Sequence, residues 1–240
     1  MARRRFFVDY ISDDRAELTG DDARHLARVL RAEPGQRFEL SDNQRAYLAE
    51  ITAVTAARVT FRILEPIPAV PPFPHITLYA ALIKFDRFEW LIEKATELGV
   101  ARIVPVDAER TEKGLASAAA KRIERWRKIA RESSQQSRRL RIPEIAPAAP
   151  FPAADPSGFR YFLDENPGAP LLLDALPPAR APEGAIAILT GPEGGWTSRE
   201  RTLATAAGWQ SVSLGGNILR AETAALAALS VLAQAWQARS

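Results

Sequence analysis

Five prolines fall within the nine residues from Pro66 to Pro74, and this stretch divides the chain into two segments of different pattern. Proline fixes its own φ and has no backbone donor, so a dense run of it favours a stiff, extended linker. We therefore place a domain boundary here, with a first domain over residues 1–70 and a second over residues 71–240. Two domains are in keeping with a chain of 240 residues.

The first domain is predicted to consist mostly of β-strands. Its clearest strand covers residues 58–64, where apolar and polar side chains alternate. One helix is predicted from about Asp22 to Arg31, and Pro34 follows it. The other predicted strands, bounded by turn residues, cover residues 6–10, 37–41 and 45–51. This pattern indicates a small β-barrel with one helix.

In the second domain predicted strands and helices alternate, which is typical of a parallel sheet covered by helices. The predicted strands cover residues 76–83, 102–106, 159–163, 185–190 and 211–214. The predicted helices cover residues 86–98, 118–137, 197–207 and 222–236. The expected fold class of this domain is therefore α/β.

The composition excludes several kinds of chemistry. The chain has no cysteine and only two histidines, so disulfides, thiolate catalysis and zinc–cysteine sites are excluded, and we expect no metal. No apolar stretch approaches the ~18–20 residues of a membrane helix. The basic N-terminus lacks the long apolar region of a signal peptide. We therefore expect a cytoplasmic protein with no membrane partner.

The distribution of charge is more informative than the net charge of +3. Residues 121–141 hold nine basic residues against Glu124 and Glu132, a local excess of seven positive charges. Such a segment indicates either a phosphate-binding surface or a solvated helix face, and the sequence leaves both open. Arg24 and Arg28 recur at helical spacing in the first domain and leave the same choice.

A glycine-containing loop follows the apolar strand that ends near Leu189. In open α/β sheets ligands bind beyond the carboxyl ends of the strands, and glycines let the backbone approach a ligand closely. The loop is neither G-x-G-x-x-G nor a P-loop, which disfavours dinucleotides and nucleoside triphosphates. We expect it to hold a planar, hydrogen-bonding group. The candidate binding residues are Leu189, Thr190, Gly191, Pro192, Glu193, Gly194 and Gly195.

A second glycine loop runs from the last predicted strand into the last predicted helix. Glu222 at the start of that helix has a simple explanation, because an acidic side chain complements the helix dipole. Arg220 has no such explanation, since a cation there is mildly unfavourable, and a functional role for Arg220 is the better interpretation. The candidate binding residues of this loop are Ser213, Leu214, Gly215, Ile218, Leu219 and Thr223.

Together the two loops resemble the C-terminal signature of the RsmE family, the small-subunit ribosomal RNA uridine-N3 methyltransferases. The resemblance lies in Gly191-Pro192-Glu193-Gly194-Gly195, in Leu214-Gly215 and in Ile218-Leu219-Arg220-Ala221-Glu222-Thr223-Ala224. Lys84 through Val100, Glu109-Arg110-Thr111 and Gln136-Ser137-Arg138-Arg139 are similar to further segments of that family. The N-terminal barrel resembles its PUA-like RNA-binding domain, so the similarity spans nearly the whole chain.

Two segments depart from the family pattern. Gln135-Gln136-Ser137-Arg138-Arg139 stands where the family usually has a Glu-Gln-Ser-Gly-Arg-like sequence, so no role of that glutamate or glycine is carried over. Gly216-Asn217 stands where the family often has a pair that contains proline. We expect the second change to affect only the shape of the loop.

The resemblance implies a SPOUT-type α/β methyltransferase domain threaded through a trefoil knot, with S-adenosylmethionine bound in the knot. It further implies a homodimer that methylates N3 of a uridine in small-subunit ribosomal RNA. Arg220 and Glu222 are the candidate catalytic residues, with Glu193 as another candidate general base. The candidate RNA-binding residues are Arg24, Arg28, Lys84, Arg110, Gln136, Arg138 and Arg139.

Two other functions stay open at this point. An RNA-binding module without catalysis would account for the barrel and the basic residues, but it would leave both glycine loops without a purpose. A SPOUT enzyme that methylates a ribose 2'-hydroxyl would use the same loops. Binding of the methyl donor tests the first alternative, and identification of the modified nucleoside tests the second.

Overall fold

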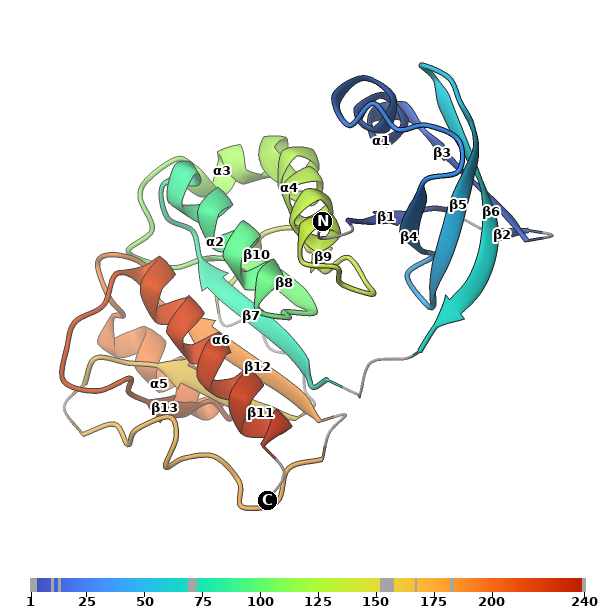
Figure 1. The fold of residues 1–240 in the computed structure, drawn as a ribbon. Helices are drawn as coiled ribbons and strands as arrows, with labels where there is room; N and C mark the ends of the chain where they lie inside the picture. Colours follow the sequence, from blue (N-terminus) through green and yellow to red (C-terminus); the bar gives the residue numbers. More distant parts are fainter. Residues whose placement is uncertain are drawn as a thin grey trace. The chain divides into compact units, whose positions relative to one another are not determined.

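The computed structural model describes residues 4–9, 11–12, 14–68, 73–151, 158–166, 168–181 and 184–238. The chain divides into two compact units (Figure 1). The first holds Met1–Pro71 together with Ser134–Ile142, and the second holds Pro72–Ser133 together with Pro143–Ser240. The expected boundary between residues 70 and 71 lies outside the described residues, as does Tyr10, the expected end of the first strand.

The first unit is built on a six-stranded sheet with the order β1-β4-β5-β6-β3-β2. The strands are β1 (Arg5–Phe7), β2 (Ile11–Ser12), β3 (Arg15–Thr19), β4 (Arg37–Ser41), β5 (Ala46–Val54) and β6 (Arg58–Ile67). Strand β1 pairs with β4 in parallel, and the other neighbours pair antiparallel. The pairing described leaves β1 and β2 as the two edges, so the sheet is an open half-barrel.

Alternation places one face of this sheet in a core. Val59 and Phe61 of β6 are buried, as are Ala16 and Leu18 of β3. The helix α1 (Gly20–Arg24) continues into one π-helical turn, η1 (His25–Val29), and packs beside them. Strand β3 was not predicted because it offers only these two apolar residues, too few for a reliable alternating pattern.

The segment Ser134–Ile142 belongs to the first unit because its side chains and backbone bond to β4 and β1. The buried Glu39 carboxylate accepts hydrogen bonds from Arg5, at 2.9 Å from Nη2, and from Arg138. The Ser41 hydroxyl donates to the Leu140 carbonyl at 2.6 Å. The local sequence pattern does not predict these long-range hydrogen bonds.

The second unit is built on a seven-stranded sheet with the order β10-β8-β7-β12-β11-β13, and β9 also pairs with β8. All of these pairs are parallel. The strands are β7 (His75–Ala81), β8 (Arg102–Asp107), β9 (Glu144–Ile145), β10 (Ala149–Pro150), β11 (Phe159–Leu163), β12 (Ala185–Thr190) and β13 (Gln210–Val212). The two-residue strands β9 and β10 are too short for a periodic signal and were not predicted.

Helices cover this sheet (Figure 1). They are α2 (Phe85–Glu97), α3 (Leu115–Ala119), α4 (Ile123–Gln136), α5 (Ser198–Ala206) and α6 (Ala221–Gln237). The helix expected over residues 118–137 begins earlier and is divided, because the 3₁₀ turn η2 (Ala120–Arg122) separates α3 from α4. Helix α6 packs on α2 and on β12.

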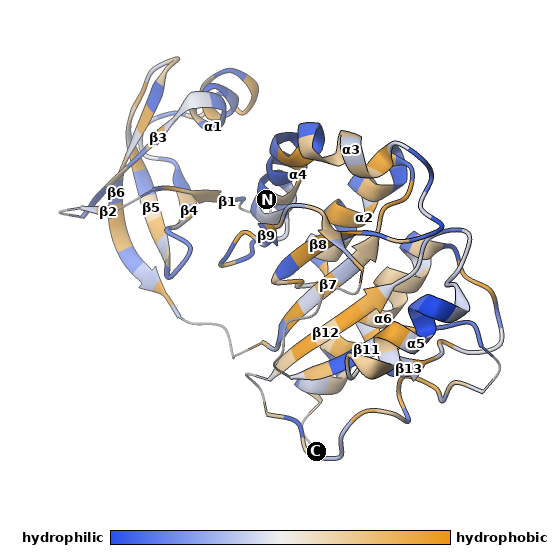
Figure 2. Cartoon of the chain, turned by 180° about the vertical axis from the view of Figure 1, so that it is seen from behind, coloured by the Kyte–Doolittle hydropathy of each residue, from blue (hydrophilic) through white to orange (hydrophobic). Residues whose placement is uncertain are grey.

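Strand β12 lies between β7 and β11, near the middle of the sheet, and its sequence has the pattern typical of a strand in an α/β domain. Residues 186–190 are all buried, and β12 is mostly apolar in Figure 2. A near-continuous apolar run is typical of a parallel strand covered on both faces. The expected α/β fold class is confirmed, while the trefoil knot stays a prediction of the family resemblance.

Candidate functional site

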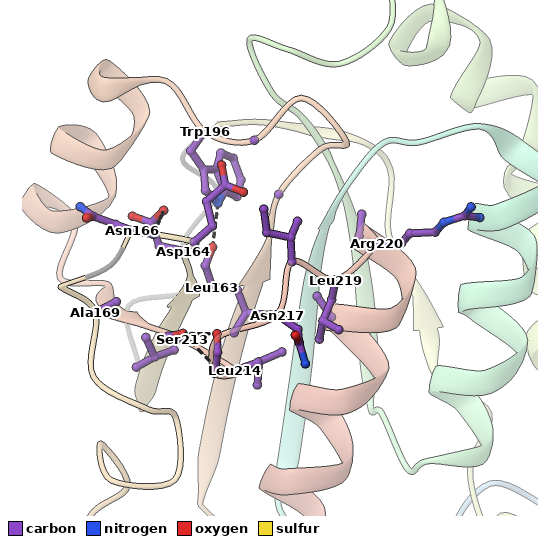
Figure 3. A pocket seen from close by; sticks show the side chains of 18 of the residues that line it. Leu163, Asp164, Asn166, Ala169, Trp196, Ser213, Leu214, Asn217, Leu219 and Arg220 are labelled. Carbon is purple, nitrogen blue, oxygen red and sulfur yellow. Dashed lines mark hydrogen bonds between the residues drawn. The ribbon is translucent and has the colours of Figure 1, made fainter.

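A cleft of about 820 Å³ lies beyond the carboxyl ends of β11, β12 and β13. In the sheet, β12 is followed by the earlier strand β11, so the order of the strands in space reverses here relative to their order in the chain. Such a switch point is where ligands bind in open α/β sheets. Figure 3 shows the labelled side chains of three separate segments around this cleft.

The loop after β12 forms the first wall, and four of its predicted residues line the cleft: Gly191, Pro192, Glu193 and Gly195. The predicted capping box then starts α5, because Thr197 accepts from the Glu200 backbone while Glu200 accepts from the Thr197 backbone. Both ends of the loop are thereby fixed, one by the sheet and the other by the helix.

Two of these glycines are required by their surroundings. A Cβ on Gly191 would lie 3.0 Å from the indole nitrogen of Trp196. A Cβ on Gly195 would lie 2.8 Å from a carboxylate oxygen of Glu165, and Gly195 has a φ of +68°, in the left-handed region. Substitution at either position would displace a residue that lines the cleft, Trp196 or Glu165.

The loop after β13 forms the second wall. Ser213, Leu214 and Gly215 line the cleft, and the Ser213 hydroxyl accepts from the Gly215 backbone N–H at 3.1 Å. Ile218 and Leu219 complete the apolar part of this wall, and Ile218 is 87% exposed. Such exposed apolar side chains beside a cleft can cover a flat ligand.

Arg220 also lines the cleft and immediately precedes α6, in an extended conformation with φ −63° and ψ 151°. Its side chain extends from the rim of the cleft in Figure 3. Across the cleft, Arg87 of α2 forms an ion pair with Glu193 of the first wall. The mouth of the site thus carries two guanidinium groups and one carboxylate.

The segment after β11 forms a third wall that the sequence analysis missed. Asp164, Glu165 and Asn166 follow the strand directly, and all three line the cleft. The signal was present, because a predicted strand over residues 159–163 also has a carboxyl end and the following residues are polar. Further lining residues outside the predicted set are Leu163, Ala169, Leu171, Trp196, Val212, Gly216, Asn217, Ala221 and Ala224.

Arg201 of α5 connects the first and third walls. Its guanidinium bonds to both carboxylate oxygens of Asp164, at 2.9 Å from Nε and from Nη2, and its Nη1 donates to the Trp196 carbonyl at 2.8 Å. The hydrogen bond to Asp164 raises the pKa of Arg201 above its ordinary value. Trp196 in turn donates to the Leu163 carbonyl at 2.9 Å.

Some of the predicted binding residues do not line the cleft. Leu189 and Thr190 are buried at the end of β12, Gly194 faces Arg110, and Thr223 is exposed on α6. Glu222 is buried, and among the described residues its Oε2 has no hydrogen-bond partner. Leu189, Thr190 and Gly194 adjoin the first wall without lining the cleft, and Glu222 is not directed into the cleft by any bond that the structure describes.

A smaller hollow of about 90 Å³ lies against the cleft and shares Pro192 and Glu193 with it. Two of the predicted RNA-binding residues, Lys84 and Arg110, line this hollow. Arg110 Nη1 donates to the Gly194 carbonyl at 2.8 Å, so its guanidinium is held against the first wall. The sequence analysis gave no reason to place these two residues beside the glycine loop.

The remaining predicted RNA-binding residues lie in the first unit. Arg24 pairs with Asp21 and is largely exposed, while Arg28 and Gln136 are exposed. Arg138 bonds to the buried Glu39, and burial lowers the pKa of Arg139 to about 10. The two arginines of this pair are therefore parts of the unit's interior bonding as well as candidates for RNA contact.

Carboxylates neutralise much of the basic segment 121–141. Arg125 bonds to both carboxylate oxygens of Glu89, at 2.7 and 2.8 Å, and Arg122 lies 3.6 Å from the same residue. Arg127 pairs with Glu124 at 2.7 Å. This pairing favours the solvated-face interpretation for the α4 arginines, although exposed ion pairs contribute little to stability.

Two classes of site find no support in the part of the chain that the structure describes. No helix there is long and apolar enough to cross a membrane. Nor do three or more histidine, cysteine or acidic side chains gather there in a way that could hold a metal ion.

Comparison with known families supports the division of the chain. Residues 71–233 match the model described as "RNA methyltransferase domain", and residues 18–64 match the "RNA methyltransferase PUA domain". Ribosomal RNA small subunit methyltransferase E of Synechocystis is 35% identical over 223 residues, covering 89% of this chain and 71% of the relative. The Mycobacterium tuberculosis protein of the same name is 32% identical, with 99% and 95% covered.

Solved structures agree over the full length. The Neisseria gonorrhoeae ribosomal RNA small subunit methyltransferase E, bound to S-adenosyl methionine, is 31% identical with a TM-score of 0.83, and 98% of each chain is covered. A Legionella pneumophila structure in complex with the cofactor SAM is 30% identical with a TM-score of 0.86 over 98% of each chain. Both structures hold the same methyl donor.

Proposed function

Since the chain belongs to the ribosomal RNA small subunit methyltransferase E family, we propose that it transfers a methyl group from S-adenosylmethionine to N3 of a uridine in small-subunit ribosomal RNA. The observation that carries the proposal is the single cleft shared by the loops 190–197 and 213–221. Relatives at 30–31% identity are described with the donor bound. The two alternatives, an RNA-binding module and a ribose 2'-O-methyltransferase, are distinguished from this proposal by the experiment below.

The cleft has the size and the chemistry that the donor needs. Its volume of about 820 Å³ lies within the usual range for small-ligand pockets, ~300–1,000 Å³. Leu214, Ile218 and Leu219 offer apolar walls for the adenine ring, and Gly191 and Gly195 let the donor approach the backbone of the first wall. The carboxylates of the third wall offer acceptors for hydroxyl or ammonium groups.

The donor, when bound, supplies an electrophilic methyl group on a positively charged sulfur. The chain's own residues hold that donor and orient the base, and positioning of this kind can contribute ~7–11 kcal/mol at the best effective molarities. Arg220, which lines this cleft, is the residue predicted from the sequence to stabilise negative charge that develops on the uracil ring. Glu193 lines the cleft and Glu222 does not, so Glu193 is the better of the two acidic candidates from the sequence.

The RNA contacts are assigned to both units. Arg24, Arg28 and Gln136 are exposed in the first unit, which matches the PUA family model, and Lys84 and Arg110 are exposed beside the cleft. We further propose a homodimer that acts in the cytoplasm. The dimer is supported by the exposed apolar side chains Leu171 and Ile218, which both lie at the cleft, because exposed apolar groups gathered at one place mark protein contacts.

One experiment tests the proposed reaction directly. Small ribosomal subunits from cells that lack this protein are incubated with the purified protein and labelled donor, and the RNA is digested to nucleosides for mass spectrometry. We expect labelled 3-methyluridine. A 2'-O-methylated nucleoside would support the ribose enzyme instead, and RNA binding with neither donor binding nor label would support a binding module.

A further inference from the structure

We infer that the small hollow beside the cleft is the seat of the target base, and that Lys84 and Arg110, rather than Arg220, which does not line the hollow, lower the pKa of its N3–H by stabilising the uracil anion. The inference rests on the proposed methyl transfer and names the residues that activate its acceptor. The position of the hollow, the charges around it and the need for a proton to leave N3 support the inference.

The position of the hollow meets the first requirement, that the acceptor must lie next to the donor. Pro192 and Glu193 line both cavities, so the hollow and the cleft adjoin at these two residues. At about 90 Å³ the hollow is small, which favours one flat pyrimidine over a purine. Enzymes that act on a base turn it out of its stack into a fitted pocket of this kind.

The lining of the hollow combines apolar and charged residues. Leu82 and Ile83 are almost fully buried, and the half-buried Leu115 provides an apolar side chain against which a base can pack. Lys84 is the last residue before α2, and its ammonium group makes no hydrogen bond or ion pair with any described residue; Arg110 is fixed by its bond to the Gly194 carbonyl. Two cations therefore flank a surface that suits a flat ring.

The chemistry of the acceptor explains why cations would be needed. The neutral N3 of uracil carries a proton, so its electron pair becomes available only as the proton leaves. The N3–CH₃ bond then forms, the S–CH₃ bond breaks and its electron pair stays on sulfur, which leaves the donor neutral. The charge of the uracil anion resides largely on its two carbonyl oxygens, where Lys84 and Arg110 can stabilise it.

The hollow also holds a base for the departing proton. Two carboxylates line it, and Glu193 is engaged by Arg87 in an ion pair. Glu112 is exposed at the rim and is the other carboxylate. Because Glu193 is engaged by Arg87, we assign the proton to Glu112 and not to Glu193, and from Glu112 it passes to solvent.

A purely phosphate-binding role for Lys84 makes different predictions. Loss of a phosphate contact weakens RNA affinity and lessens its salt dependence, but leaves the ionisation of the base unchanged. Loss of anion stabilisation leaves RNA affinity nearly intact, lowers kcat and moves the pH–rate profile to higher pH. A substrate with a more acidic N3–H should relieve the second defect and not the first.

The test compares Lys84→Met with Lys113→Met, a matched exposed lysine that lines neither cavity. Each variant is assayed at several pH values on small subunits whose RNA contains uridine or 5-fluorouridine, whose N3–H is more acidic. For Lys84→Met we expect a fall in kcat of roughly 10²-fold on uridine. We also expect a rise of activity toward high pH, a much smaller loss on 5-fluorouridine and unchanged donor affinity by calorimetry.

Equal losses on both substrates, or a change in RNA affinity alone, would overturn the inference, as would wild-type behaviour of Lys84→Met. Glu112→Gln provides a second variant and should lower kcat while retaining donor binding; full activity would remove Glu112 from the proton path. If the wild-type protein methylates no uridine N3, it is the proposed function that fails. If the wild type methylates and Lys84→Met resembles Lys113→Met, only the present inference fails.

Discussion

The Arg201 guanidinium forms a bidentate ion pair with the Asp164 carboxylate, with Nε 2.9 Å from Oδ2 and Nη2 2.9 Å from Oδ1. The Asp164 side chain is 3% exposed and that of Arg201 is 29% exposed, so this pair is shielded from water far better than a surface ion pair. Because Arg201 also holds the Trp196 carbonyl, one side chain fixes the spacing of two walls of the cleft.

Replacing Arg201 with Met should therefore weaken both the fold and donor binding. The change leaves a buried carboxylate without its partner, which typically costs ~3–5 kcal/mol, and the partial exposure of Arg201 favours the lower end. We expect urea denaturation to show a loss of about 3 kcal/mol and calorimetry to show weaker donor binding. In the double variant with Asp164→Asn part of the lost stability should return; additive losses would show that the two residues are not coupled.

Donor binding should depend sharply on which glycine is substituted. Gly195→Val places a branched side chain at φ +68° and against the Glu165 carboxylate, so we expect donor affinity to fall by at least about tenfold, ~1.4 kcal/mol. Gly114→Val is the matched control, since Gly114 also has a left-handed φ, +91°, lines neither cavity, and has nothing within 4 Å of its added Cβ. Calorimetry on folded protein should give wild-type affinity for the control, and unchanged affinity for Gly195→Val would remove the first wall from the donor site.

Two of the three walls were predicted because a glycine loop that follows a strand can be recognised from the local sequence alone. The third wall, Asp164 to Asn166, follows an equally visible strand, but its meaning depends on β11 lying beside β12 in the sheet. That neighbour relation is a long-range pairing that no local pattern contains. Likewise, the positions of Lys84 and Arg110 beside Pro192 are set by tertiary structure.

The fold was easier to predict than the site. Strands 37–41, 159–163 and 185–190 have the expected bounds, because a buried or alternating apolar run is a local property. The break between α3 and α4 and the short strands β9 and β10 were missed, since they are set by packing and pairing. The membership of Ser134–Ile142 in the first unit was missed for the same reason.

Tyr161 on β11 should make the protein less stable in alkali. Its hydroxyl is buried with no hydrogen-bond partner among the described residues, and this burial raises its pKa to about 12 from 10.0. Between these pH values the unfolded chain loses the phenol proton while the folded chain keeps it, so stability falls as pH rises through this window. We expect a loss of roughly 1–2 kcal/mol, reduced from the full two-unit shift by partial solvation.

Tyr161→Phe removes both the unpaired hydroxyl and the titrating group. Urea denaturation at neutral pH should give a gain of about 1 kcal/mol, since an unsatisfied buried hydroxyl costs ~1–3 kcal/mol. The alkaline fall in stability should be smaller than in the wild type, whereas Tyr47→Phe, at a half-buried position of β5, should leave that fall unchanged. The same alkaline slope in Tyr161→Phe and the wild type would contradict the assignment.

Arg28 and Arg138 should differ in how they affect RNA binding. Arg28 is exposed and its side chain makes no hydrogen bond or ion pair with any described residue, whereas Arg138 bonds to Glu39, whose side chain is 6% exposed. A residue that contacts phosphate lessens the salt dependence when it is removed, by ~0.7–0.9 in the slope of log K against log salt. For Arg28→Met we expect a change of that size and unchanged stability, while Arg138→Met should lower the free energy of unfolding and leave the slope intact.

Filter binding at several salt concentrations, combined with urea denaturation, measures both quantities. A change of slope in Arg138→Met of the size expected for Arg28→Met would show that Arg138 contacts phosphate despite its bond to Glu39.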